Sequence, residues 1–220
     1  MNKFLIAFFL LFSIAAKAQN SGMVKIFNTS DHQKPLLVYF SGDGGFNSFT
    51  NALLADLSGN GYDIVAINSK SYFWRKKTPQ QTAAFIQPYL QKYLPDHKLQ
   101  SFVLIGYSFG ADVMPFVYNN LSTGFAKSGT KIILLAPSPT TDFEVHMLDM
   151  AGGSGKYNMD VVAEINKIKN VPVYMISSSK SDFPVNNIKS KNICKTILNG
   201  SFHFDKDPKV VLPVIYKSLN

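Results

Sequence analysis

The chain has 220 residues, 46% of them hydrophobic and 16% charged, with a formal net charge of +8 at pH 7. This length and composition suit a single domain with a sizeable core. The single cysteine, Cys194, excludes an internal disulfide bond and a thiolate metal cluster, and its apolar neighbours predict a small buried side chain. The basic charge fits either contact with an anionic surface, such as phospholipid headgroups, or a solvated surface rich in lysine.

The first 18 residues predict a secretory signal peptide. Lys3 precedes an apolar run over residues 4–16, and Ala16-Lys17-Ala18 is a cleavage site of the A-x-A type, with cleavage expected before Gln19. The apolar run is short for a membrane anchor, and no later run is long enough to cross a bilayer. We therefore expect residues 19–220 to form one exported, soluble domain without a transmembrane segment.

Apolar runs that read as strands alternate along the chain with helix-like patterns. Strands are expected at 23–28, 36–40, 62–68, 102–105, 131–136, 171–177 and 192–198, and helices at 48–59, 78–94, 111–120, 161–168 and 209–219. Residues 70–77 form an aromatic and basic loop, and residues 141–147 alternate like a short edge or flap strand. The alternation predicts an α/β fold with a mainly parallel sheet and helices on both faces.

Residues 106–110, Gly-Tyr-Ser-Phe-Gly, match the G-x-S-x-G nucleophile elbow, with a predicted strand before them and a helix after them. The turn forces strained backbone geometry on the serine, so Cβ atoms two residues to either side would clash, which explains both glycines. At a helix N-terminus, Ser108 would also meet N–H groups that favour developing negative charge. The motif predicts that Ser108 is a nucleophile, and an ordinary strand-to-helix turn is the alternative.

A serine nucleophile requires a base, and the base requires an orienting carboxylate. In α/β-hydrolases these follow the serine in the order acid, then histidine. Asp182 follows the strand at 171–177 and His203 follows the strand at 192–198, so both lie at the sheet edge where Ser108 emerges. We therefore predict a triad of Ser108, Asp182 and His203.

The other three histidines and two late aspartates are expected to have structural positions. His32 and His97 are expected at the surface and His146 on the exposed edge of the flap strand, whereas Asp205 and Asp207 are expected to begin the last helix. No metal motif, Rossmann fingerprint or P-loop is present, so we expect neither a metal nor a cofactor, and no nucleic-acid partner.

The glycine-rich loop at 41–46 is expected to complete an oxyanion hole. The N–H of Phe109 would supply one donor, and the second would come from Asp43 or, as second choice, Gly44. Asp112 lies one helical turn past Ser108, where a carboxylate needs a partner. We expect it to accept N–H groups of residues 42–45, or else to face the pocket and meet a substrate ammonium group.

Five segments together resemble the VirJ and AcvB family of bacterial virulence proteins. They are SGDGGF at 41–46, SKSYFWRKKTP at 69–79, LIGYSFGADVMPF at 104–116, SPTTDFEVH at 138–146 and GSFHFD at 200–205. The resemblance implies a periplasmic α/β-hydrolase that releases lysine from lysyl-phosphatidylglycerol, and VirJ is also implicated in type IV secretion. The family's serine, late acid and late histidine correspond to Ser108, Asp182 and His203.

The chain departs from the family pattern at two positions. The family usually has paired histidines in the final block, and here the first position is Phe202. The tryptophan that often follows SGDGG is Phe46 here, a conservative change. His203 alone must therefore serve as base, and the pocket beside it is expected to differ.

An aminoacylated anionic phospholipid would account for several other residues. Carboxylates at Asp43, Asp112, Asp142 or Glu144 could meet the lysyl ammonium groups, Tyr107 would lie beside the nucleophile, and the loop at 70–77, with Tyr72, Trp74 and Arg75, could contact phosphate and acyl chains. The basic loop is equally well explained as a solvated turn. The alternatives are an esterase for another soluble or cell-wall ester, and a non-catalytic periplasmic protein that interacts with secretion-system proteins.

Overall fold

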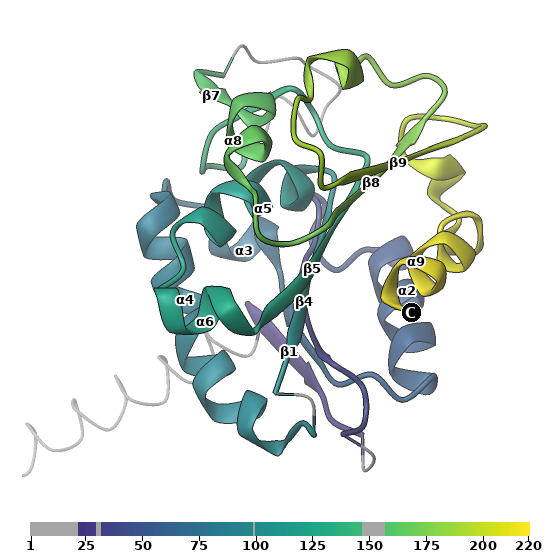
Figure 1. Cartoon of the computed structure of the whole chain (residues 1–220). Helices are drawn as coiled ribbons and strands as arrows, with labels where there is room; N and C mark the ends of the chain where they lie inside the picture. The colour runs from purple at the N-terminus through teal and green to yellow at the C-terminus, as the bar shows by residue number, and fades with distance from the viewer. Residues whose placement is uncertain (1–21, 30–31, 99, 147–156) are drawn as a thin grey trace, which may run out of the picture.

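The computed structural model describes residues 22–29, 32–98, 100–146 and 157–220. One seven-stranded sheet lies at its centre, with strand order β1-β3-β2-β4-β5-β8-β9 (Figure 1). The strands are β1 (Val24–Phe27), β2 (Leu36–Phe40), β3 (Ile64–Ile67), β4 (Phe102–Tyr107), β5 (Gly129–Leu135), β8 (Val173–Ser178) and β9 (Ile193–Leu198). Only β1 runs antiparallel to its neighbour, so the predicted mainly parallel sheet is confirmed.

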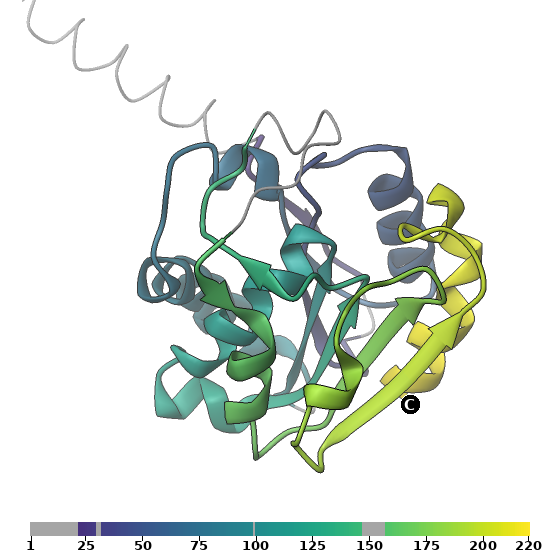
Figure 2. The ribbon, with the colours of Figure 1, turned by 90° about the horizontal axis from the view of Figure 1, so that it is seen from above.

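Helices cover both faces of the sheet, which is clearest in the view from above (Figure 2). The helices α2 (Ser48–Gly59) and α9 (Leu212–Leu219) pack on one face, and α4 (Pro79–Tyr93), α5 (Phe109–Asn119) and α8 (Val161–Lys167) pack on the other. Shorter elements are α3 (Ser69–Tyr72), α6 (Thr123–Ser128), the pair β6 (Thr140–Thr141) and β7 (Met159–Asp160), and the 3₁₀ turns η1 (Leu94–Asp96), η2 (Val185–Asn187), η3 (Phe204–Lys206) and η4 (Pro208–Val210).

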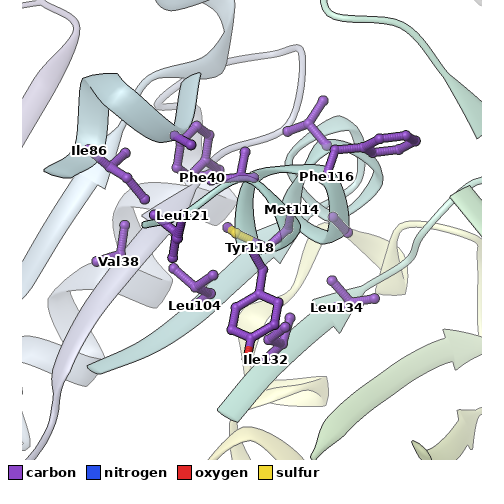
Figure 3. Packing of buried hydrophobic residues seen from close by; sticks show 14 of the residues in the cluster. Val38, Phe40, Ile86, Leu104, Met114, Phe116, Tyr118, Leu121, Ile132 and Leu134 are labelled. Carbon is purple, nitrogen blue, oxygen red and sulfur yellow. The ribbon is translucent and has the colours of Figure 1, made fainter. Parts of the chain in front are cut away.

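The central strands are buried on both faces, which is why they read as continuous apolar runs. Every residue of β2, β3 and β4 is buried. Side chains alternate between the two layers, so that Val38 and Leu104 face α4 and α5 (Figure 3), whereas Leu37 and Val103 face α2 and α9. Because these strands are parallel, their carboxyl ends lie at the same end of the sheet, where the loops that follow them can carry functional side chains.

Local signals set the helix starts. The Asn47 side chain accepts the N–H of Thr50 (2.9 Å) and caps α2. At α4, the Gln81 N–H donates to the Thr78 hydroxyl (3.1 Å) while the Gln81 side chain accepts the Thr78 N–H (2.9 Å), which is a capping box. Pro79 at the first helical position needs no hydrogen-bond acceptor, so the helix begins where the sequence predicts it.

The prediction of a flap strand over residues 141–147 is wrong for residues 142–146, which the structure describes. Only Thr140 and Thr141 are in a strand, paired with β7, and residue 147 lies outside the described residues. The N–H of Val145 donates to the Phe73 carbonyl (2.9 Å), and the N–H of Lys77 donates to the Phe143 carbonyl (2.8 Å). The backbone groups of this segment are thus satisfied by the loop after α3 instead of by a sheet partner. The predicted loop over residues 70–77 overlaps the helical turn α3, which was not predicted from the sequence.

Two side chains lie differently from expectation. Cys194 is exposed, because it lies on the edge strand β9, whose central residues are not covered by a helix. His97 is buried, with 2% of its surface exposed, and its ring nitrogen Nδ1 donates to the Lys34 carbonyl (2.8 Å). The predicted signal peptide at residues 1–18 lies outside the described residues, and in the part that is described no helix has the length and apolarity needed to span a bilayer.

Candidate active site

The chain turns sharply between β4 and α5, and Ser108 occupies the turn. Its backbone has φ 51° and ψ −122°, a conformation that costs free energy for any residue with a Cβ atom. A Cβ atom at Gly106 would lie 2.6 Å from the Ala111 Cα atom, and one at Gly110 would lie 2.6 Å from the Ser41 carbonyl oxygen. Neither contact is sterically possible, so the packing requires both glycines, in agreement with the interpretation of the motif.

His203 lies beside the nucleophile. Its Nε2 atom is 3.2 Å from the Ser108 hydroxyl oxygen, a hydrogen-bond distance. The loop that carries His203 follows β9 and is anchored by Phe204, which is fully buried. The N–H of Asp205 donates to the Ser201 hydroxyl (2.7 Å), and the Asp205 carboxylate accepts the Ser201 N–H (3.2 Å). Asp205 thus braces the histidine loop instead of starting the last helix as expected.

Asp207 does start a helical turn, as predicted. Its carboxylate accepts the N–H of Lys209 (3.0 Å) and caps η4, just before α9. The end of the chain is therefore folded back against the sheet directly after the histidine loop, which fixes the loop from its C-terminal side.

The surroundings of His203 favour a neutral imidazole. Burial lowers the pKa of His203 below its ordinary value, the Asp43 carboxylate acts in the opposite direction, and Lys206 adds to the lowering. The rings of Tyr107 and Phe202 flank the imidazole with centroids at 5.9 Å and 4.8 Å. At neutral pH, Nε2 is therefore free to accept the proton of Ser108, as a general base must.

The loop at 41–46 lies against the nucleophile. Ser41 fastens it, since its hydroxyl accepts the Ser69 N–H (2.9 Å) and its carbonyl accepts the Ser69 hydroxyl (2.6 Å). A Cβ atom at Gly42 would lie 3.3 Å from the Ser108 Cβ atom. This close approach brings the backbone of the loop to the place where an oxyanion would develop.

The expected oxyanion donors differ in availability. The N–H of Gly44 donates to the Asp43 carboxylate (2.8 Å), so it is already occupied. Within the described ranges, no hydrogen bond uses the N–H of Asp43 or of Phe109. Phe109 is the first residue of α5, where N–H groups lack an intrahelical acceptor. The geometry thus leaves Asp43 and Phe109, the two first choices, as candidate donors.

A cavity of about 460 Å³ opens beside these groups. Its lining mixes polar and apolar groups and carries one carboxylate and one ammonium group. The lining residues are Gly42, Asp43, Gly44, Asn47, Ser48, Phe49, Tyr107, Ser108, His203 and Lys206. Lys206 was not predicted from the sequence to line the cavity, although its position three residues after His203 indicates that it could lie close to the active site. Positive φ angles at Phe204, Asp205 and Lys206 (55° to 57°) turn this segment back toward the nucleophile.

The predicted acid, Asp182, lies in the loop after β8 and is exposed. In the part of the chain that the structure describes, no hydrogen bond joins Asp182 to His203. Asp43 is the carboxylate whose charge acts on the imidazole. The structure thus brings together Ser108 and His203 but does not bring Asp182 to them.

Asp112 does not bind the loop at 42–45. It is buried, and one of its carboxylate oxygens accepts the N–H of Ser138 (2.6 Å), in the loop after β5. Burial raises the pKa of Asp112 well above its ordinary value. Asp112 is not part of the cavity lining, so it fastens α5 to the neighbouring strand end instead of facing the cavity.

Of the other residues expected to meet substrate, Asp43 and Tyr107 line the cavity. Tyr72 is buried, and its hydroxyl donates to the Gln81 carbonyl (3.4 Å), so it is a core residue. Trp74 and Arg75 are exposed on the loop after α3, and 53% of the Trp74 surface is accessible. Trp74 and Arg75 can therefore contact another molecule or a surface, whereas the buried side chain of Tyr72 cannot.

The parallel sheet, the strained serine and the adjacent histidine define an α/β-hydrolase. Solved structures support this fold: MenH from S. aureus aligns with a TM-score of 0.63 at 13% identity, covering 90% of this chain and 99% of that chain. The naproxen esterase from Bacillus subtilis aligns with a TM-score of 0.61 at 13% identity over 90% and 87% of the two chains. At this identity, the likeness shows the fold alone.

The family is shown by a sequence model. Residues 34–220 match the model described as bacterial virulence protein (VirJ), so the chain belongs to the VirJ family. The comparison with curated proteins found no match. The resemblance inferred from the five sequence segments is therefore confirmed at the level of the family.

Proposed function

We propose that this protein is a serine hydrolase that cleaves a carboxylic ester, with Ser108 as nucleophile and His203 as general base. The order of residues along the chain supports Asp182 as the acid of the triad, although its side chain is exposed and makes no described hydrogen bond to His203. The observation that carries the proposal is the 3.2 Å contact between the Ser108 hydroxyl and Nε2 of His203 at a strained elbow. Strain of this kind persists where the surrounding structure enforces it, and it clusters at active sites. An ordinary strand-to-helix turn would require neither the strain nor the histidine.

The arrangement of groups accounts for each step of ester cleavage. As the Ser108 oxygen attacks the ester carbonyl carbon, its proton passes to His203, and the oxyanion accepts hydrogen bonds from the N–H groups of Phe109 and Asp43. His203 then returns the proton to the leaving alkoxide, which departs as an alcohol and leaves an acyl-serine. Water, deprotonated by the same imidazole, hydrolyses the acyl-serine and frees the acid.

We further propose that the substrate is an aminoacylated anionic phospholipid, with lysyl-phosphatidylglycerol the first choice. Membership of the VirJ family supports this choice, and the cavity supplies complementary charges. The Asp43 carboxylate suits an ammonium group of the lysyl moiety, and the Lys206 ammonium suits the lipid phosphate. The exposed Trp74 and Arg75 suit contact with the lipid surface.

The proposed location is the periplasm, reached through cleavage of the predicted signal peptide at residues 1–18. The positive n-region, apolar h-region and A-x-A site support export. N-terminal sequencing of the protein recovered from a bacterial periplasmic fraction tests this directly. A chain that begins at Gln19 supports export, and a chain that retains Met1 contradicts it.

The class of activity and the substrate are tested separately. A fluorophosphonate probe should label the unmodified protein but not the Ser108→Ala variant, and an absence of labelling on folded protein would contradict the serine hydrolase. Thin-layer chromatography should then show phosphatidylglycerol and free lysine appearing from lysyl-phosphatidylglycerol vesicles. Labelling without lipid turnover would retain the hydrolase and reject the lipid, which leaves an esterase for another soluble or cell-wall ester.

A non-catalytic interaction protein, associated with secretion, is the second candidate. It is favoured by the exposed position of Asp182, which makes no described hydrogen bond to His203. A protein of this kind would keep the elbow only as scaffold, and it would fail to react with the fluorophosphonate even when folded. The labelling experiment therefore distinguishes the two candidates.

A further inference from the structure

Two histidines and an aspartate lie close together at the amino ends of β3 and β4, at the opposite end of the sheet from Ser108. Asp63 immediately precedes β3, His97 precedes β4, and His32 lies in the segment between β1 and β2. Ser108, in contrast, follows β4 at its other end. The three residues are therefore separate from the candidate active site, and the hydrolase chemistry gives them no role.

One carboxylate oxygen faces both imidazoles. Oδ2 of Asp63 lies 2.5 Å from Nδ1 of His32 and 3.3 Å from Nε2 of His97. The other oxygen, Oδ1, accepts the N–H of Thr29 and is thereby held in place. Asp63 has 4% of its surface exposed and His97 has 2%, whereas the His32 side chain has 36%, so the group is open to solvent on the His32 side.

The tautomer of His97 is fixed by its backbone partner. Nδ1 lies 2.8 Å from the Lys34 carbonyl oxygen, which can only accept a hydrogen bond, so Nδ1 carries a proton. In a neutral imidazole, Nε2 then directs a lone pair at the Asp63 carboxylate. Two electron-rich atoms at 3.3 Å require a positive centre between them, which is either a proton on Nε2 or a cation.

The geometry suits a metal ion. Zinc binds histidine nitrogen and carboxylate oxygen at about 2.0–2.2 Å, which places two ligands of a tetrahedral ion roughly 3.3–3.5 Å apart. The separation between His97 and Asp63 falls in this range. The 2.5 Å contact between His32 and Asp63 is a direct hydrogen bond, so His32 would have to move outward by roughly 1 Å to bind an ion beside Asp63. The three ligand atoms all lie within 4.8 Å of one another. Histidines that bind metals also commonly donate their second ring N–H to a backbone carbonyl, as His97 does.

We propose that His32, Asp63 and His97 form a binding site for one divalent first-row transition-metal ion, for which zinc is the natural probe. Two imidazoles and one carboxylate are suitable ligands for this class, and the exposure of His32 leaves a coordination position for water. The ligands come from three separate segments of the chain. A bound ion would therefore hold the connection between β1 and β2 against the starts of β3 and β4, and it would stabilise the folded chain.

The test uses the purified full chain, stripped of metal with a chelator. Calorimetric titration with zinc should give one ion per chain, and cobalt should give the visible absorption of a tetrahedral or five-coordinate site. Zinc at 100 times its dissociation constant should raise the unfolding midpoint by about 5–10 °C. A failure to bind stoichiometrically would overturn the proposal and would leave a proton on His97 as the explanation of the contact.

Variants locate the ion. His32→Ala changes a half-exposed residue and should weaken zinc binding at least 10-fold while the chain still folds, and Asp63→Asn should do the same. His146→Ala is the matched control, because His146 also lies next to a carboxylate, that of Asp142, at 2.8 Å, but in a different part of the fold. Loss of binding in His146→Ala with retention in His32→Ala and Asp63→Asn would overturn the assignment.

Discussion

The hydroxyl oxygen of Ser108 lies 3.2 Å from Nε2 of His203, although 95 residues separate the two in the chain. The contact forms because the parallel strands β4 and β9 have their carboxyl ends at the same end of the sheet. Ser108 directly follows β4, and the loop after β9 brings His203 to it. The serine is held by the strained elbow and the histidine by the buried Phe204 next to it.

Ser108→Ala and His203→Ala should each lower kcat on a soluble activated ester by at least about 10³-fold, because the first removes the nucleophile and the second removes the base that activates it. The unfolding midpoint should change little, because neither side chain is a core residue. Steady-state kinetics and thermal unfolding measured on the same samples check this. Activity within a few-fold of the unmodified protein in either variant would contradict the assignment.

Asp182→Asn should lower kcat by about 10²–10⁴-fold with the fold intact, because the acid of a triad orients the base and stabilises its protonated form. The control is Asp96→Asn, which changes an exposed carboxylate of η1 at the other sheet edge. If Asp182→Asn and the control have equal, unchanged rates, Asp182 is not the acid, and Asp43 remains as the carboxylate that acts on His203.

Asp43→Asn and Lys206→Met should shift the acidic limb of kcat/KM in opposite directions. The catalytic form of His203 is neutral, so activity falls as the pH drops through its pKa. The Asp43 carboxylate raises the pKa of His203, so its removal should move the limb to lower pH. Lys206 lowers that pKa, so its removal should move the limb to higher pH. Shifts of the same sign in both variants would contradict this electrostatic account.

Asp112→Asn should preserve or raise stability at pH 7, whereas Asp112→Ala should lower it by about 1–3 kcal/mol. Burial raises the pKa of Asp112, so the folded state favours the neutral form, and the stability that Asp112 contributes is lost as the pH rises above its unfolded pKa. Asparagine is neutral and keeps an acceptor for the Ser138 N–H, whereas alanine leaves that N–H without a partner. Denaturant unfolding at pH 4 and pH 7 measures this, and a gain from asparagine that does not grow with pH would contradict it.

Gly110→Ala should destabilise the fold by about 2 kcal/mol or more, because its Cβ atom would overlap backbone atoms of residues 40 and 41. Gly124→Ala in α6 is the matched control, since no atom lies within 4 Å of its Cβ position. There, alanine should be neutral or stabilise the chain by up to about 1 kcal/mol. Unfolding curves that do not separate the two variants would show that the elbow tolerates a side chain.

The sequence by itself determined the layers of this protein and the place of its nucleophile. Continuous apolar runs at residues 36–40 and 102–105 predict strands covered on both faces, and the two glycines around Ser108 predict the strained turn. These signals are local, because period, cap and turn chemistry act within a few residues. The family was also readable, since its motifs are continuous segments.

Apart from the contact between Ser108 and His203, contacts between distant segments were decided only by the tertiary structure. The sequence could not show that Asp112 binds Ser138, that Lys206 turns back into the cavity, or that Asp63 meets two histidines 31 and 34 residues away on either side. No motif spacing encodes such pairs, because the strand order brings them together. Burial was likewise decided by the packed structure. His97 is buried and bonds to the Lys34 carbonyl, just before β2, whereas Cys194 is exposed on the edge strand β9.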